Sequence, residues 1–215
     1  MNYFLKRFLI QLIIMEKTIL GNDLEICRIL NGMWQVAGGH GQIDSQLAIQ
    51  DMEKYQKLGF TTWDLADIYG PAESLIGDFN KKDKYNFQAF TKFVPNPGPM
   101  SNSIVTYYIE ESLKKMNVKC IDLLQFHWWD YQDSSYLDAL QHLSKLQNEG
   151  KIKHLGLTNF DTERIKIIIE KGFKIISNQV QFSILDQRPE KIMIPFFVKY
   201  GIQILSYGTL LGGFF

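Results

Sequence analysis

Short apolar runs and longer amphipathic stretches alternate along most of this chain. The short runs have the length of β-strands and are rich in β-branched and aromatic residues. Seven of them lie at residues 28–33, 61–66, 86–93, 121–128, 154–158, 175–181 and 201–207. Apolar residues recur at helical spacing between them, for instance at residues 44–58, 103–116, 136–148 and 163–171. The pattern therefore predicts about seven repeats of a strand followed by a helix.

A β-hairpin is predicted ahead of these repeats. Two extended runs in the stretch KTILGNDLEICRIL flank Gly21, Asn22 and Asp23. Tight turns favour these residue types, because they tolerate a positive φ angle or hydrogen-bond to the nearby backbone. We expect this hairpin to cover the amino-terminal end of the strands.

Polar residues at the strand ends decide between two architectures. Alternating strands and helices form either an open doubly wound sheet or a closed (β/α)₈ barrel. A barrel carries functional side chains at the carboxyl ends of many strands, whereas a doubly wound sheet collects them at one switch point. The marked positions here are Asp64, Tyr69, Lys92, His127, Thr158, Asn159, Gln179, Gln181 and Tyr207. Because they belong to six different strands, we predict a (β/α)₈ barrel.

Asp64 lies among core positions of its predicted strand. Alternate side chains of a strand face opposite ways, so Asp64 shares a face with Thr62 inside an otherwise apolar run. Removing a charge from water costs several kcal/mol, roughly, unless a partner compensates for it. Lys92, at the end of the next strand, is the cation that we expect to pair with Asp64.

Composition and charge favour a single globular domain with a small ligand. The chain has 215 residues, of which 46% are hydrophobic and 21% are charged. This length and composition suit one domain with a sizeable core. Lysine plus arginine equals aspartate plus glutamate, at 23 each, so no overall field attracts nucleic acid or anionic lipid. We therefore expect a small-molecule substrate and no nucleic-acid partner.

Neither a disulfide framework nor a metal site is expected. Cys27 and Cys120 are the only cysteines, too few and too far apart for a thiolate site, and a reducing compartment suits them. We expect both to be small core residues. A metal-dependent barrel hydrolase is disfavoured, because the sequence has no His-x-His motif or comparable carboxylate cluster.

The first 16 residues differ from the rest. Lys6 and Arg7 precede a short apolar run, as at the start of a secretory signal. However, Gln11 interrupts the run, no small-residue cleavage site follows, and the run is too short to span a bilayer. We predict an extension or weak targeting segment at residues 1–16 and a barrel domain at residues 17–215. The expected location is cytoplasmic without stable membrane insertion, and organelle targeting is the alternative.

Several motifs together resemble those of the aldo-keto reductases. They are WDLADIYG, TKF, FHWW, GLTNF, NQVQFS and ILSYGTLLGG. The resemblance runs from about residue 24 to the carboxyl terminus, and its specificity comes from reactive residues that recur in order on consecutive strands. It implies a (β/α)₈-barrel oxidoreductase that moves hydride between NADP(H) and a carbonyl or alcohol.

The chemistry of carbonyl reduction requires the same residue types. Negative charge develops on the substrate oxygen, so the site must deliver a proton and stabilise that oxygen. The resemblance assigns Tyr69 as proton donor, supported by Asp64, Lys92 and His127, with His127 orienting the substrate oxygen. An ammonium beside a tyrosine favours the phenolate, so we expect Lys92 to lower the pKa of Tyr69.

The resemblance also implies a coenzyme site. Thr158 and Asn159 match the pair that hydrogen-bonds the nicotinamide carboxamide, and Gln179 matches a third carboxamide partner. Tyr207 matches the aromatic residue that stacks on the nicotinamide ring, which leaves one ring face free for hydride transfer. Ordinary core packing is the alternative for Tyr207.

A glycine-rich segment and two tryptophans are expected near the substrate. The segment VAGGHGQ at residues 36–42 fits neither the GxGxxG nor the Walker pattern, so a loop at the barrel mouth is the better interpretation. The resemblance places this loop beside the substrate together with Trp128 and Trp129. We therefore expect an aromatic-walled pocket.

The carboxyl terminus departs from the family pattern. After GTLLGGFF the sequence lacks an eighth strand, closing helices and the segment that holds the adenosine 2′-phosphate. We therefore expect an incomplete barrel of about seven strands, truncated at its carboxyl end. Two function classes stay open, namely an active reductase and a catalytically impaired truncation product or non-catalytic interaction subunit.

Overall fold

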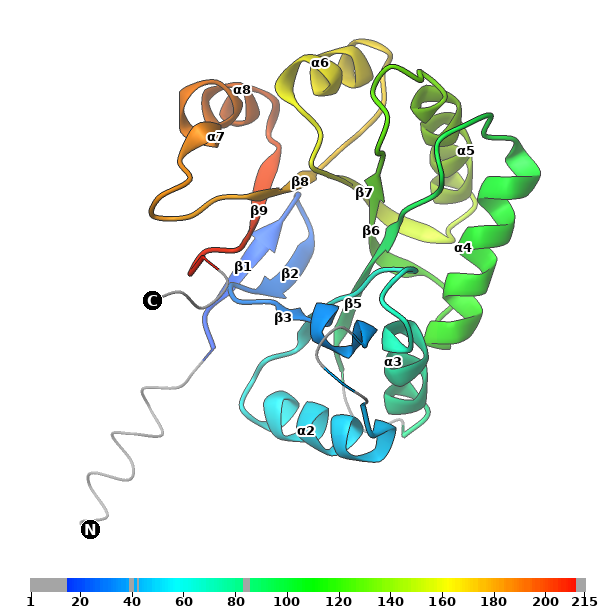
Figure 1. Cartoon of the computed structure of the whole chain (residues 1–215), viewed down its shortest axis with the longest axis vertical. Helices are drawn as coiled ribbons and strands as arrows, with labels where there is room; N and C mark the ends of the chain where they lie inside the picture. Colours follow the sequence, from blue (N-terminus) through cyan, green and yellow to red (C-terminus); the bar gives the residue numbers. More distant parts are fainter. Residues whose placement is uncertain (1–14, 39–40, 42, 83–85, 212–215) are drawn as a thin grey trace.

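Seven parallel strands form one curled sheet in the computed structural model of this chain (Figure 1). The structure describes residues 15–38, 41, 43–82 and 86–211. The strands are paired in chain order: β3 (Asn31–Gly32), β4 (Thr62–Asp64), β5 (Gln88–Phe93), β6 (Ile121–His127), β7 (Ile152–Thr158), β8 (Ser177–Gln181) and β9 (Gln203–Tyr207). Most of the predicted extension at residues 1–16 lies outside the described residues, as do residues 39, 40 and 42 of the glycine-rich segment.

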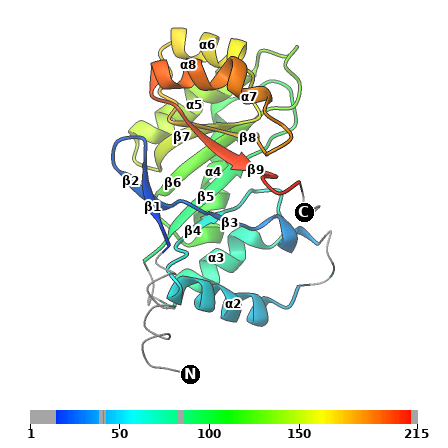
Figure 2. The ribbon, with the colours of Figure 1, turned by 90° about the vertical axis from the view of Figure 1, so that its left-hand side faces the viewer.

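Helices cover the outer face of this sheet (Figures 1 and 2). They are α2 (Ser45–Lys57), α3 (Ala72–Asn80), α4 (Asn102–Met116), α5 (Tyr136–Asn148), α6 (Thr162–Glu170), α7 (Arg188–Lys191) and α8 (Met193–Tyr200). The short helix η1 (Trp34–Ala37) lies instead just after the carboxyl end of β3. Side chains cap three of them, because Asp44, Ser101 and Asp161 accept hydrogen bonds from backbone amides of the first turns of α2, α4 and α6. The repeated strand-then-helix order is that of an incomplete (β/α)₈ barrel.

The prediction of a barrel with about seven strands is confirmed, and the alternative of an open doubly wound sheet is wrong. The first strand is shorter than predicted, since only Asn31 and Gly32 of residues 28–33 pair with β4. Within the described residues β3 and β9 each pair with one strand only and not with each other. The ring is therefore open between them, as Figure 1 shows.

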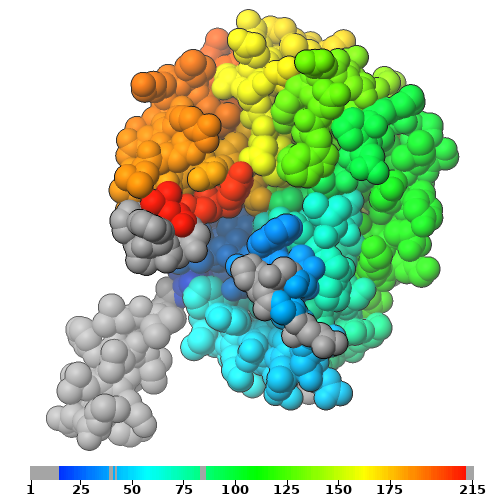
Figure 3. All heavy atoms as spheres, viewed as in Figure 1, coloured from blue at the N-terminus to red at the C-terminus, as the bar shows by residue number. Residues whose placement is uncertain are grey.

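The hairpin is present and lies at the amino-terminal end of the strands, as predicted. β1 (Lys17–Leu20) and β2 (Leu24–Cys27) are antiparallel, with Gly21 in the turn at a φ of 63°. Their inward side chains form a second apolar cluster with those of the strand interiors, made of Leu20, Leu24, Ile26, Phe90, Leu123 and Leu205. The side chain of Gln203, on β9, fixes the hairpin. Its Oε1 accepts a hydrogen bond from the Gly21 backbone amide, and its Nε2 donates one to the Ile19 carbonyl. The hairpin therefore closes one end of the barrel interior, and Figure 3 shows it at the bottom of the central hollow.

Cys27 is fully buried at the end of this hairpin, as expected for a core residue. Cys120 is only partly buried, because it lies in the turn before β6, so the core assignment is wrong for that residue. Within the part of the chain that the structure describes, no helix has the length and apolar character needed to cross a membrane.

The main core fills the space between the sheet and the helices, and it depends on a close approach of α3 to α4. Gly77 of α3 lies against the last turn of α4, where a Cβ atom would be 1.9 Å from the Lys115 carbonyl oxygen. That atom belongs to the backbone, so it cannot rotate away as a side chain could. Glycine is therefore required at this crossing for steric reasons.

We expect Gly77→Ala to lower the free energy of unfolding by roughly 1–3 kcal/mol, because overpacking forces the two helices apart. The matched control is Gly32→Ala, whose added Cβ atom would have no neighbour within 4 Å. Urea unfolding followed by circular dichroism measures both. Equal stability of the two variants would contradict the close packing of α3 on α4.

Candidate active site

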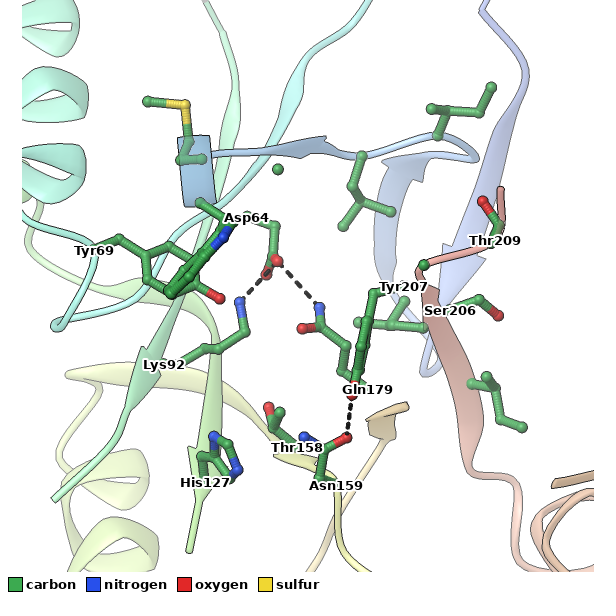
Figure 4. A pocket seen from close by; sticks show the side chains of 18 of the residues that line it. Asp64, Tyr69, Lys92, His127, Thr158, Asn159, Gln179, Ser206, Tyr207 and Thr209 are labelled. Carbon is green, nitrogen blue, oxygen red and sulfur yellow. Dashed lines mark hydrogen bonds and ion pairs between the residues drawn. The ribbon is translucent and has the colours of Figure 1, made fainter. Parts of the chain in front are cut away.

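A cavity of about 810 Å³ opens at the carboxyl ends of the strands. Its volume is in the range of small-molecule and cofactor sites. All eight of the predicted site residues line it: Asp64, Tyr69, Lys92, His127, Thr158, Asn159, Gln179 and Tyr207 (Figure 4). They come together because parallel strands end at the same rim of the barrel.

Asp64 and Lys92 form a buried ion pair at the centre of this cavity. The Lys92 ammonium donates to Asp64 Oδ2 at 2.7 Å and to the Leu65 carbonyl at 2.9 Å. The side chains are 3% exposed for Lys92 and 13% exposed for Asp64. Each charge needs the other, because an unpaired ion at this depth would lose its solvation without compensation.

Two carboxamides complete the hydrogen bonds of Asp64. Gln179 Nε2 donates to Oδ2 at 3.1 Å, and Gln125 Nε2 donates to Oδ1 at 2.6 Å. Gln125 was not among the residues predicted from the sequence. A signal for it exists, since a glutamine two positions before His127 in an apolar strand faces the same side as that histidine.

Tyr69 lies over the Lys92 side chain, with the ammonium 5.0 Å from its ring centroid. The pKa of Tyr69 is nevertheless raised above its ordinary value, first by burial and then by the Asp64 carboxylate. The prediction of a lowered pKa for Tyr69 is therefore wrong, because burial and the carboxylate outweigh the lysine. Because Asp64 compensates the ammonium and burial disfavours a phenolate, Tyr69 holds its proton at neutral pH.

His127 stays neutral at physiological pH. Burial, and secondarily the charge of Lys92, lowers its pKa to about 4. A neutral imidazole has one nitrogen that donates a hydrogen bond and one that accepts. His127 can therefore donate to a carbonyl oxygen without adding a positive charge to the cavity.

Thr158 and Asn159, two of the residues expected to bind the coenzyme, lie at the carboxyl end of β7 and line the cavity. Asn159 has a left-handed backbone with φ of 60°, and its Oδ1 accepts from the Tyr207 hydroxyl at 3.0 Å. That contact leaves the Asn159 amide hydrogens for another acceptor. Thr158 Oγ1 is buried without a hydrogen-bond partner among the described residues, although it lines the cavity. An unpaired hydroxyl beside a free amide fits a carboxamide ligand, which offers both a donor and an acceptor.

The prediction that Trp128 walls the pocket is wrong. Its side chain is fully buried against Phe126, and its indole nitrogen donates to the Asp130 carbonyl at 2.7 Å. The chain has left β6 at His127, and this hydrogen bond turns the indole into the core. Trp129 is largely exposed and lies beside His127, with ring centroids 4.2 Å apart, but it is not among the residues that line the cavity either.

Trp34 is an aromatic residue of the cavity that the sequence did not single out. It is half-exposed on η1 and meets Tyr69 edge to face, with ring centroids 5.1 Å apart. Its position directly after the first strand was the available signal. The glycine-rich segment at residues 36–42 lies partly outside the described residues, and His40 is among those not described.

The fold is that of the (β/α)₈-barrel class, with a cluster of polar residues at its strand ends. A family model for the aldo/keto reductase family matches residues 28–215, and the chain belongs to that family. It is 25% identical to the NADH-specific methylglyoxal reductase of Escherichia coli, over 91% of this chain and 68% of that protein.

Solved structures show the same fold. The thermostable aldo-keto reductase Tm1743 superposes with a TM-score of 0.82 at 24% identity, covering 94% of this chain and 75% of that one. The holo form of aldo-keto reductase AKR11C1 from Bacillus halodurans superposes with a TM-score of 0.80 at 25% identity, covering 93% of this chain and 68% of that one. The chain spans 63% to 68% of the length of four bacterial relatives.

Among the described residues, no three His, Cys, Asp or Glu side chains lie close enough to hold a metal ion.

A second carboxylate lies just outside the cavity. Asp67 Oδ2 accepts from the Val94 amide at 3.1 Å, and Oδ1 is buried without a hydrogen-bond partner among the described residues. Burial, and then the nearby Glu73 carboxylate, raises the pKa of Asp67 to about 6. Folding therefore favours the protonated form of this carboxyl.

This carboxyl makes the free energy of unfolding depend on pH. Between about pH 4 and pH 6 the folded state binds the Asp67 proton more tightly than the unfolded state, so stability falls as pH rises through that window. We expect Asp67→Asn to match the wild type near pH 4 and to be more stable by roughly 1–3 kcal/mol at pH 7.5. Chemical unfolding at several pH values tests this, with Asp78→Asn, in an exposed ion pair with Lys81, as the control. A difference that does not vary with pH would contradict the burial of Asp67.

The imidazole of His127 should titrate near pH 4, because burial opposes its charged form. Nuclear magnetic resonance of the ring carbon signals measures the midpoint, and the signal is assigned by its loss in His127→Gln. Lys92→Met should raise this midpoint part of the way toward the ordinary histidine value, because the lysine charge is the second cause of the lowered pKa. A midpoint near 6.5 in the wild type would show that His127 is not buried in this way.

Proposed function

We propose that this protein catalyses hydride transfer between a nicotinamide coenzyme and a small carbonyl or alcohol, with Tyr69 as the proton donor. The observation that carries the proposal is the buried Asp64–Lys92 pair beside Tyr69 and His127 at a cavity of suitable volume. Family membership supports the same reaction class. The activity of the whole protein is part of this proposal, because the chain spans only about two thirds of its relatives' length.

The coenzyme would be held by the residues around the unpaired Thr158 hydroxyl. Asn159 and Gln179 would bind the nicotinamide carboxamide together with Thr158, and the Tyr207 ring would pack against the nicotinamide. A bound nicotinamide coenzyme supplies or accepts the hydride. The resemblance favours NADP(H), whereas one relative is named as NADH-specific, so both coenzymes belong in the assay.

The proton that the substrate oxygen needs would come from the Tyr69 hydroxyl. As hydride reaches the carbonyl carbon, negative charge grows on the oxygen, and the raised pKa of Tyr69 keeps a proton ready for it. The neutral imidazole of His127 would donate a hydrogen bond to the same oxygen and orient it. Lys92, fixed by Asp64, would stabilise the phenolate that remains.

We expect Tyr69→Phe to lower the turnover number for carbonyl reduction by roughly 10²–10⁴-fold, the usual contribution of general acid catalysis. Coenzyme affinity should change little, because the proposal assigns the missing oxygen to the substrate rather than to the coenzyme. Steady-state oxidation of NADPH and NADH with aliphatic and aromatic aldehydes measures turnover, and coenzyme fluorescence measures binding.

Tyr107→Phe is the matched control, since it removes the same oxygen from an exposed tyrosine of α4. Full reductase activity in Tyr69→Phe would contradict the assignment of the proton donor. Coenzyme binding without turnover in the wild type would favour the non-catalytic interaction subunit. The assay includes the 215-residue chain and the product of any longer transcript of the same gene.

A further inference from the structure

Gln125 is a buried polar residue that supports the candidate active site without lining its cavity. It lies on β6 opposite Lys92 of β5 in the parallel register, so the two side chains are neighbours on the inner face of the barrel. It has no exposed surface. An uncharged amide at such a position is costly unless its hydrogen bonds are made.

Only one orientation of the Gln125 amide suits its surroundings. Nε2 points to Asp64 Oδ1, whereas Oε1 is buried with no hydrogen-bond partner within the described residues. Rotating the amide would place Oε1 against the carboxylate oxygen, and two acceptors would then repel each other. The core therefore retains an unpaired oxygen so that the bond to Asp64 is made, which favours a role for that bond.

The two oxygens of Asp64 have different partners. Oδ2 accepts from Lys92 and Gln179, whereas Gln125 is the described partner of Oδ1. Contacts at one oxygen alone leave the carboxylate free to rotate about its last bond. Gln125 fixes the plane of the carboxylate and so fixes the direction in which Oδ2 holds the Lys92 ammonium.

We propose that Gln125 is a positioning residue that orients Asp64 and, through it, aims Lys92 at Tyr69. Its catalytic consequence rests on the proposed reductase function. A glutamine suits this task because it donates a hydrogen bond without adding charge, so Lys92 keeps its electrostatic role beside the phenol. Gln179 differs, because it lines the cavity and is shared with the proposed coenzyme site.

Two substitutions separate positioning from simple space filling. Gln125→Leu keeps a similar volume but removes the donor, and it should lower the turnover number about ten- to a hundredfold, the size expected for one hydrogen bond to a charged group. The Michaelis constant for the coenzyme should stay within about twofold, because Gln125 does not line the cavity.

Gln125→Glu gives a signature that a merely structural role would not produce. The introduced carboxyl can donate to Asp64 only while protonated, and once ionised it repels the Asp64 carboxylate. The ratio of variant to wild-type turnover should therefore be highest near pH 5.5 and should fall as the pH rises to 8. A ratio that does not vary with pH would contradict the proposal.

Asn178→Leu is the matched control, since it removes another buried carboxamide, one that donates to the Phe160 carbonyl at 2.9 Å. Its turnover ratio should not depend on pH.

A crystal structure of Gln125→Leu provides a readout that needs no activity, and we expect a rotated Asp64 carboxylate. If the wild type reduces no carbonyl compound, the proposed function fails, and the crystal structure of Gln125→Leu alone decides the positioning role. An Asp64 carboxylate that has not moved in that variant would overturn the positioning role of Gln125.

Discussion

The buried ion pair between Asp64 and Lys92 is the interaction on which the candidate site depends. Neither charge could remain at this depth alone, since the effective cost of desolvating an ion is several kcal/mol, roughly. The pair persists because the ammonium also donates to the Leu65 carbonyl and the carboxylate accepts from two amides. Asp64, Lys92 and the two amides come from four strands, β4, β5, β6 and β8, so the strands must curl for these contacts to form.

Burial decides the protonation states around the pair. Tyr69 keeps its proton because burial and the Asp64 charge raise its pKa, and His127 stays neutral because burial lowers its pKa. Asp64 compensates the ammonium, so Lys92 does not control the resting state of the phenol. A carbonyl oxygen entering the cavity would therefore meet two neutral donors, Tyr69 and His127.

The rest of the fold supports this arrangement from outside the cavity. The hairpin closes the amino-terminal end of the barrel with an apolar cluster, which leaves the polar residues at the other end. The close contact of α3 with α4 at Gly77 packs the helices that follow β4 and β5. The two strands that supply Asp64 and Lys92 are therefore held from both the inner and the outer face of the sheet.

The sequence alone determined the order of strands and helices, the hairpin and eight of the residues that line the cavity. It could do so because periodicity and turn chemistry are local, and because parallel strands all end at one rim. Tertiary structure alone decided which way Trp128 turned, how far β3 pairs, and that Gln125 reaches Asp64. It also reversed the expected direction of the Tyr69 pKa shift. These outcomes depend on burial and on contacts between residues far apart in the chain, which no local pattern encodes.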